Sequence, residues 1–313
     1  MQWVMSLVAL VVGAAVVRVW AHLGQRRPLF RRLLFGAIAL LGLLACVAGV
    51  ALWAGLGSQF IQNQRSVALA FAGVGLGLLL PLMPWVRRAL AWVTPIDPAS
   101  VLDTVGLSAA FAFIGLSVGI TTALSPDTTL QPVTLSELVA QSAAFVVVAF
   151  VLVGLGIERG WHETIERLGF RPLSLRGVGN ALALIALLFV ASGLAGALTQ
   201  ALQPELTQQV GQRMVELTGP VSSLPGAVVL GISAGVGEEI LFRGAIQPRF
   251  GIWLTSLLFT MAHVQYAFSF LLLGVFALSL ILGWERKRYG TLACILTHAG
   301  YDLIAVLLQS VVR

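Results

Sequence analysis

Long apolar runs recur along the whole chain, each of roughly the 20 residues that a helix needs to cross a bilayer at a rise of about 1.5 Å per residue. Short polar breaks separate these runs. The pattern predicts membrane-spanning helices at 2–20, 33–54, 67–86, 104–124, 138–157, 177–199, 223–243, 252–266, 267–284 and 291–311. The eighth run is short, and residues 252–284 can be divided differently. The defensible range is therefore eight to ten spans, with ten preferred.

The composition supports a membrane protein. The 313 residues are 58% hydrophobic and only 10% charged, whereas about a quarter of the residues of a soluble domain are charged. Backbone groups in lipid must be paired within the chain, and helices achieve this. We therefore expect an all-α polytopic transmembrane helix bundle. Residues 2–20 are expected to be a retained span and not a signal peptide, because their positive charge follows the apolar run.

The distribution of positive charge predicts an orientation. With the N-terminus outside, one face receives all but three of the 19 Lys and Arg residues, and those three are Arg65, Arg213 and Arg313. Cytoplasmic loops carry such an excess of positive charge. We expect an integral protein of a bacterial inner membrane. The chain shows no basic cluster interleaved with aromatic residues, so no nucleic-acid partner is expected.

Polar breaks also suggest a division of the chain. We expect an accessory transmembrane unit at 1–157, a cytoplasmic linker at 158–176 that could form an interfacial helix, and a catalytic bundle at 177–313. Cys46 and Cys294 lie in apolar spans, which gives no support for a disulfide or a CxxC metal site. The lone polar residues Gln141 and Asn180 are expected to form interhelical hydrogen bonds.

The last third of the chain places ionisable residues inside apolar sequence. Such groups are costly in lipid, usually face inward and often mark a functional site. The six residues concerned are Glu238, Glu239, Arg243, His263, His298 and Asp302. Several small residues accompany them, and these are expected to allow close helix packing: Gly231, Gly235 and Gly237.

Spacing within the helices suggests how these residues pair. Glu239 and Arg243 are four apart, on one helical face, and should form an ion pair that keeps Glu239 ionised. The neighbouring Glu238 points about 100° away and suits a general base. His298 and Asp302 are also four apart and should share a face.

Helical rise places Glu238, His263, His298 and Asp302 at a similar depth, nearer the cytoplasm. A water held between Glu238 and His263 could attack an amide carbonyl, while His298 and Asp302 stabilise the oxyanion. Alternatively, Glu238, His263 and His298 could bind Zn²⁺. Because HExxH is absent, we prefer the Glu-activated water, which requires no cofactor.

Three motifs occur in order, each on an apolar span. They are EExxxR at Glu238, Glu239 and Arg243, FxxxH at Phe259 and His263, and HxxxN/D at His298 and Asp302. Together they resemble the CPBP family, which comprises the type II CAAX prenyl endopeptidases and the bacteriocin-processing (Abi) membrane proteases. The resemblance covers about residues 220–310.

The resemblance implies a catalytic base at Glu238, supported by Glu239 and Arg243. It implies that His263 helps to hold the water, and that His298 and Asp302 line the oxyanion side. Family members often have Asn at the last position, and a carboxylate such as Asp302 is a poorer oxyanion donor. The family has been described both as metalloproteases and as metal-free glutamic proteases, so both chemistries stay open.

We therefore expect an intramembrane endopeptidase that cleaves a peptide bond near the cytoplasmic leaflet. Its substrate would be a membrane-associated peptide or protein, with a prenylated C-terminus or a maturing peptide as candidates. Two alternatives stay open. A non-catalytic scaffold or immunity protein would not need Glu238, and a proton-coupled transporter would use buried carboxylates and imidazoles as relays. A transporter also predicts inverted repeats, which are not evident.

Overall fold

The computed structural model describes residues 2–57, 61, 63–124 and 131–311. Within these ranges the secondary structure is helical and contains no strand, which confirms the expected all-α class. The α-helices are α1 Gln2–Arg26, α2 Pro28–Trp53, α3 Gln64–Leu79, α4 Pro84–Leu90, α5 Val101–Ala123, α6 Leu135–Val153, α7 Trp161–Leu168, α8 Leu175–Leu202, α9 Pro204–Thr218, α10 Leu224–Glu239, α11 Gln247–Met261, α12 Leu271–Tyr289 and α13 Thr291–Val311.

Eight helical segments among the described residues are long and apolar enough to cross a membrane. This count lies within the expected range but below the preferred ten. Two predicted spans, 223–243 and 252–266, fall in one segment, Leu224–Met261. The chain leaves helical geometry there only at Gly251, whose φ of 77° suits a glycine. Helix α12 is not among the eight, because charged residues fill its last turns.

The chain divides by packing into two compact units. Unit 1 comprises Met1–Val16, Thr129–Pro248 and Ser269–Arg313, and unit 2 comprises Val17–Thr128 and Arg249–Phe268. Helix α6 thus groups with the C-terminal helices, although it precedes residue 157. The functional division at 157 and 176 stays a prediction. The segment expected to be a linker contains the short helix α7.

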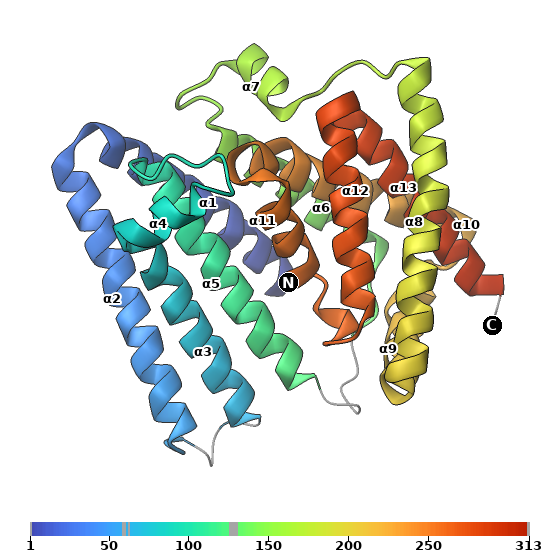
Figure 1. The fold of residues 1–313 in the computed structure, drawn as a ribbon, viewed down its shortest axis with the longest axis horizontal. Coiled ribbons are helices and arrows are strands. Elements are labelled where there is room, and N and C mark those ends of the chain that lie inside the picture. The colour runs from blue at the N-terminus through green and yellow to red at the C-terminus, as the bar shows by residue number, and fades with distance from the viewer. Residues whose placement is uncertain (1, 58–60, 62, 125–130, 312–313) are drawn as a thin grey trace. The chain divides into compact units, whose positions relative to one another are not determined.

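In unit 2, helix α3 packs against both α2 and α5 (Figure 1). Glycines permit this close approach. A Cβ on Gly73 of α3 would lie 2.7 Å from the Cα of Gly115 on α5. Small residues let helix backbones approach in lipid, where van der Waals packing drives helix association.

In unit 1, helix α10 packs against α13 and α6. On the α13 side, a Cβ on Gly235 would lie 3.0 Å from two atoms of Ala299, its backbone nitrogen and its Cβ. On the α6 side, a Cβ on Gly237 would lie 2.8 Å from the Cα of Ser142. The expected role of these glycines in close packing is confirmed. Helix α10 therefore presents one face to α13 and another to α6.

Candidate active site

The EExxxR motif lies where α10 changes its helical form. The α-helical part ends at Glu239, and the chain continues directly as a π-helical segment, Ile240–Ile246, which carries Arg243. Such segments are rare and frequently occur at functional sites. Arg243 Nε lies 3.2 Å from Glu239 Oε2, and both side chains are 0% exposed. The ion pair predicted from the spacing is confirmed.

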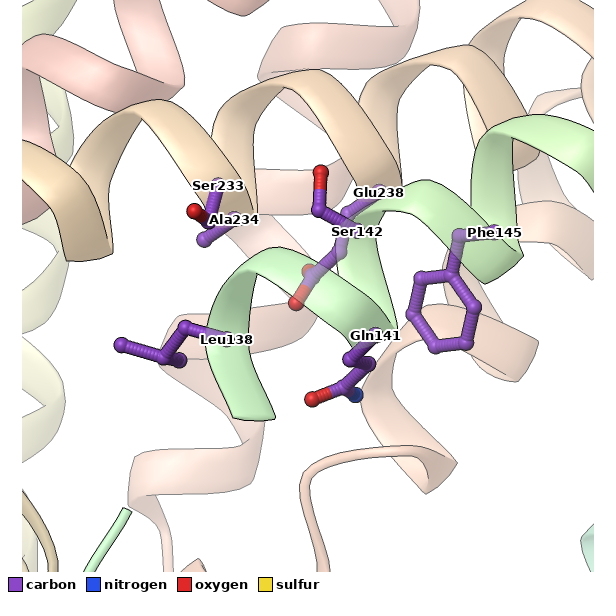
Figure 2. Close-up of a pocket in the computed structure, with 7 residues that line it drawn as sticks. All are labelled: Leu138, Gln141, Ser142, Phe145, Ser233, Ala234 and Glu238. Atoms are coloured by element: carbon purple, nitrogen blue, oxygen red, sulfur yellow. The ribbon is translucent and has the colours of Figure 1, made fainter. Parts of the chain in front are cut away.

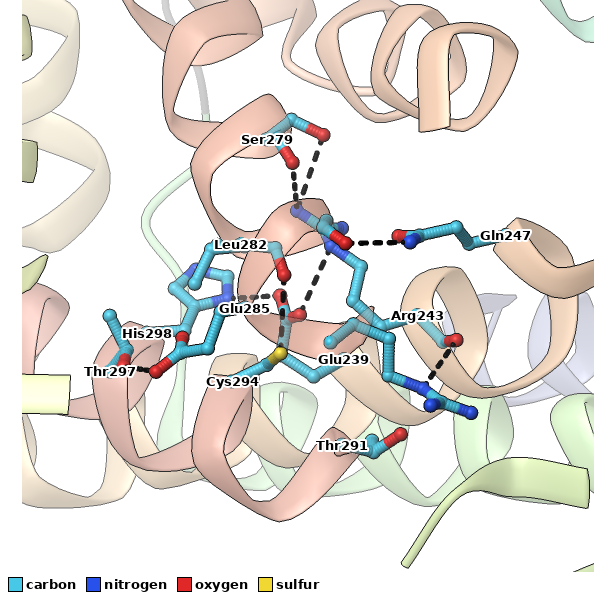
Figure 3. Close-up of polar contacts among 12 residues, drawn as sticks. Glu239, Arg243, Gln247, Ser279, Leu282, Glu285, Thr291, Cys294, Thr297 and His298 are labelled. Atoms are coloured by element: carbon cyan, nitrogen blue, oxygen red, sulfur yellow. Dashed lines mark hydrogen bonds and ion pairs between the residues drawn. The ribbon is translucent and has the colours of Figure 1, made fainter. Parts of the chain in front are cut away.

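Contacts from α12 fix the Arg243 guanidinium. Its Nη2 donates to Ser279 Oγ at 3.2 Å. Arg286 of the same helix donates from Nε to the backbone carbonyl oxygen of Arg243 at 3.1 Å, which holds the main chain at this residue. Figure 3 shows Ser279 and Glu239 beside the guanidinium. The cation is therefore held by a carboxylate on one side and by α12 on the other.

Glu239 also contacts the HxxxD motif on α13. Its Oε1 lies 2.8 Å from His298 Nδ1 (Figure 3). The other ring nitrogen, Nε2, lies 3.4 Å from Asp302 Oδ2. The predicted His298–Asp302 proximity is confirmed. The spacing gave no sign of the Glu239–His298 contact, because the two residues belong to different helices.

Glu238 faces a different neighbour. It lines a cavity of about 40 Å³ between α10 and α6, and Figure 2 shows its side chain extending from α10 toward α6. Within the described part of the chain, its buried Oε2 has no hydrogen-bond partner. A cavity of this size has room for at least one water. The two adjacent glutamates thus face different neighbours, as their separation of about 100° around the helix predicted: Glu238 lines the cavity, and Glu239 contacts Arg243 and His298.

His263 and Phe259 lie in unit 2. His263 Nδ1 is 2.7 Å from the Phe259 carbonyl oxygen, and the two ring centroids are 4.6 Å apart. The FxxxH spacing therefore corresponds to a local contact. The structure brings Glu239, Arg243, His298 and Asp302 together in unit 1. The water between Glu238 and His263 stays a prediction.

A buried carboxylate on α12 was missed by the sequence analysis. Glu285 is 0% exposed, and its Oε1 accepts from Thr297 Oγ1 at 2.9 Å and from Asn180 Nδ2 at 3.2 Å. The interhelical hydrogen bond expected of Asn180 is confirmed. Glu285 directly follows the predicted span 267–284. Its position at the end of an apolar run was the one feature of the sequence that could have indicated a buried carboxylate.

Gln141 does not make the interhelical bond that its lone position predicted. It lines the cavity beside Glu238 and has no hydrogen-bond partner among the described residues. Ser142 and Ser233 line the same cavity and likewise have none there. The unit predicted to be accessory, 1–157, thus contributes polar side chains beside the predicted base.

Zinc binding by Glu238, His263 and His298 stays an alternative, because Glu238 and His298 belong to unit 1 and His263 belongs to unit 2. No group of three or more His, Cys, Asp and Glu side chains suited to a metal ion occurs in the described ranges. The two ring nitrogens of His298 lie beside carboxylates, at 2.8 Å from Glu239 Oε1 and 3.4 Å from Asp302 Oδ2. Cys294 donates to the Leu282 carbonyl oxygen at 3.3 Å. A catalytic zinc needs three such ligands directed at one point.

Residues 220–304 match the family described as Type II CAAX prenyl endopeptidase Rce1-like. They form a Rce1-like segment. The segment contains every residue of the three motifs, and the match supports the CPBP resemblance. A stretch of 71 residues is 37% identical to the uncharacterized protein YpbD of Bacillus subtilis (strain 168).

That stretch covers 22% of this chain and 38% of YpbD, so the chain spans well under half of this relative's length. No solved structure matches the chain significantly. The Rce1-like segment includes helices α10, α11 and α12 and most of α13, and it excludes α6. The cavity beside Glu238 is therefore lined by residues from inside and outside the segment.

Proposed function

We propose that this integral membrane protein is an intramembrane endopeptidase in which Glu238 activates the hydrolytic water. The observation that carries the proposal is the placement of Glu238. Its side chain lines a cavity with room for water, and its buried Oε2 has no partner among the residues that the structure describes. The buried Glu239–Arg243 pair follows directly in the chain. The Rce1-like match supports the same activity. A base must reach the proton it removes, directly or through one water.

The proposed reaction is the hydrolysis of an amide. Glu238 takes a proton from the water as the water oxygen attacks the carbonyl carbon, which forms a tetrahedral intermediate. Glu238 then gives that proton to the leaving nitrogen, and the C–N bond breaks. The products are a new carboxylate terminus and a new amine terminus. A carboxylate that is not committed to an ion pair suits both proton transfers.

The buried residues around Glu239 position the site. Arg243 balances the charge of Glu239, and Glu239 orients the His298 ring from α13. Asp302 contacts the second ring nitrogen. As the resemblance implies, His263 would help to hold the water. A rigid supporting shell of this kind keeps reacting groups within the narrow geometry that catalysis requires.

The substrate class follows from the membrane setting. We propose a membrane-associated peptide or protein, with a prenylated C-terminus as the first candidate and a maturing peptide as the second. The excess of Arg and Lys on one face supports cleavage near the cytoplasmic leaflet of a bacterial inner membrane.

Comparative mapping of peptide termini tests the function. Wild-type protein and Glu238→Gln are expressed at matched levels, and new termini are identified by mass spectrometry. A farnesylated CAAX peptide and its unprenylated copy serve as defined probes for the purified protein in liposomes. Glu216→Gln is the matched control, because Glu216 is an exposed residue of α9 outside the cavity.

We expect termini and peptide cleavage that require Glu238 and persist in Glu216→Gln. Identical termini from the wild type and from a folded Glu238→Gln would contradict the proposal and favour the scaffold or immunity alternative. Transport driven by a pH gradient, without proteolysis, would favour the transporter.

A further inference from the structure

The cavity between α6 and α10 gathers polar side chains that have no partner. Gln141 and Ser142 come from α6, and Ser233 and Glu238 come from α10. Figure 2 shows the four side chains on the two neighbouring helices. Among the described residues, Gln141, Ser142 and Ser233 form no hydrogen bond, and Glu238 Oε2 is buried without one. Three polar side chains that face no described partner, together with one buried carboxylate oxygen, make this cavity suited to a polar ligand.

Gln141 is the most informative of these residues. It lies within the candidate span Leu135–Val153 and is exposed. An exposed amide in a membrane-spanning helix needs a hydrogen-bond partner, and the described residues supply none. Such a group is costly unless a ligand satisfies it. A carboxamide presents one acceptor and two donors, which matches the N–H and C=O of a peptide group.

Hydrolysis creates a need for a hydrogen-bond donor. The tetrahedral intermediate carries an oxyanion, and preorganised donors aimed at it supply much of the catalysis in acyl transfer. The last position of the HxxxN/D motif is Asp302, and its carboxylate contacts His298 Nε2. The other nitrogen of His298 contacts Glu239. The His298 ring thus contacts Asp302 on one side and Glu239 on the other.

We propose that Gln141 Nε2 donates a hydrogen bond to the carbonyl oxygen of the scissile peptide group, while its Oε1 accepts from a neighbouring substrate N–H. Ser142 adds a second donor from the same helix. The ligand of this site is thus an extended peptide backbone lying between α6 and α10. The inference rests on the proposed function, because it assigns a substrate contact to the same reaction.

The first test is kinetic, with the full-length protein in liposomes and the farnesylated CAAX peptide as substrate. Gln141→Leu keeps the approximate size of the side chain and removes the amide. Loss of one oxyanion donor typically lowers kcat by about 10²–10³-fold, and we expect this loss together with a higher KM, because the amide also accepts from a substrate N–H. Gln141→Asn should recover part of the activity. Val139→Ala is the control, because Val139 is an exposed residue of α6 outside the cavity.

A second test does not require cleavage. A photo-crosslinking amino acid at position 141, in the Glu238→Gln background, should capture the farnesylated peptide, whereas one at position 139 should not. Equal capture at both positions, or none at 141, would overturn the assignment. So would a kcat within twofold of the wild type for Gln141→Leu.

The two proposals can fail separately. If Gln141→Leu cleaves normally while Glu238→Gln is inactive, the protease stands and the role of Gln141 is lost. If peptide is captured at position 141 but no cleavage depends on Glu238, the binding site stands and the protease is lost.

Discussion

Glu239 Oε1 lies 2.8 Å from His298 Nδ1, although 59 positions separate the two residues in the chain. The contact joins the EExxxR motif of α10 to the HxxxD motif of α13. Arg243 contacts the other oxygen of the same carboxylate at 3.2 Å. One buried carboxylate therefore couples two motifs, and substitutions at any of the three residues should affect the others.

Arg243→Met should strongly destabilise the protein. The substitution leaves the carboxylate of Glu239 without its guanidinium partner in a fully buried site. Breaking a buried pair in this way costs about 3–5 kcal/mol. The loss can be measured as a lower Tm in detergent. Arg176→Met at an exposed position is the control. The double variant Glu239→Gln with Arg243→Met should recover part of the loss, and a wild-type Tm for Arg243→Met would contradict this account.

Asp302→Asn should retain cleavage within about tenfold. An Asn side-chain oxygen can still contact His298 Nε2, and the lost ionic part of this 3.4 Å contact corresponds to about 1.5 kcal/mol. Asp302→Leu offers no acceptor and should lose far more activity. Turnover of the farnesylated peptide distinguishes the two variants. Equal turnover by Asp302→Asn and Asp302→Leu would show that catalysis does not depend on the contact between Asp302 and His298.

Gly237→Ala should separate α10 from α6. The added Cβ would lie 2.8 Å from Ser142 Cα, so a backbone must shift. Forcing extra atoms into a packed interface costs about 1–3 kcal/mol, and the shift would also move Ser142 and Gln141 away from Glu238. We expect a lower Tm together with a lower kcat. Gly193→Ala on α8 is the matched control, because no atom lies within 4 Å of its Cβ position. A neutral effect of Gly237→Ala on both measures would contradict the close packing.

Glu285→Leu should destabilise unit 1, whereas Glu285→Gln should be tolerated. The carboxylate accepts hydrogen bonds from Asn180 on α8 and Thr297 on α13, so it ties α12 to both helices. A leucine would leave both donors unpaired, at about 1–3 kcal/mol for each group. Glutamine keeps an acceptor oxygen. Thermal unfolding in detergent tests the difference, and similar Tm values for Leu and Gln would remove this structural role.

Cleavage should survive treatment with metal chelators. The two ring nitrogens of His298 face Glu239 and Asp302, which leaves this residue poorly placed as a zinc ligand. The measurement is turnover of the farnesylated peptide before and after chelation, followed by addition of Zn²⁺. Loss of activity on chelation and recovery with Zn²⁺ would favour the metalloprotease alternative over the Glu-activated water.

The preferred span count shows where hydropathy alone falls short. Residues 252–266 and 267–284 looked like two further spans, yet the structure supports eight candidates. Hydropathy does not register that the chain is helical on both sides of Gly251. It also gives little weight to the charged end of α12, where Glu285 is buried by partners from α8 and α13.

The sequence by itself determined the all-α membrane class, the three motifs and the local pairs. Helix period places residues four apart on one face, so Glu239–Arg243 and His298–Asp302 followed from spacing. Only the tertiary structure decided that Glu239 joins His298, that Glu285 is buried, and that α6 brings Gln141 to the cavity of Glu238. The reason is physical: helical periodicity orients side chains around one axis, whereas packing between distant helices sets which faces meet.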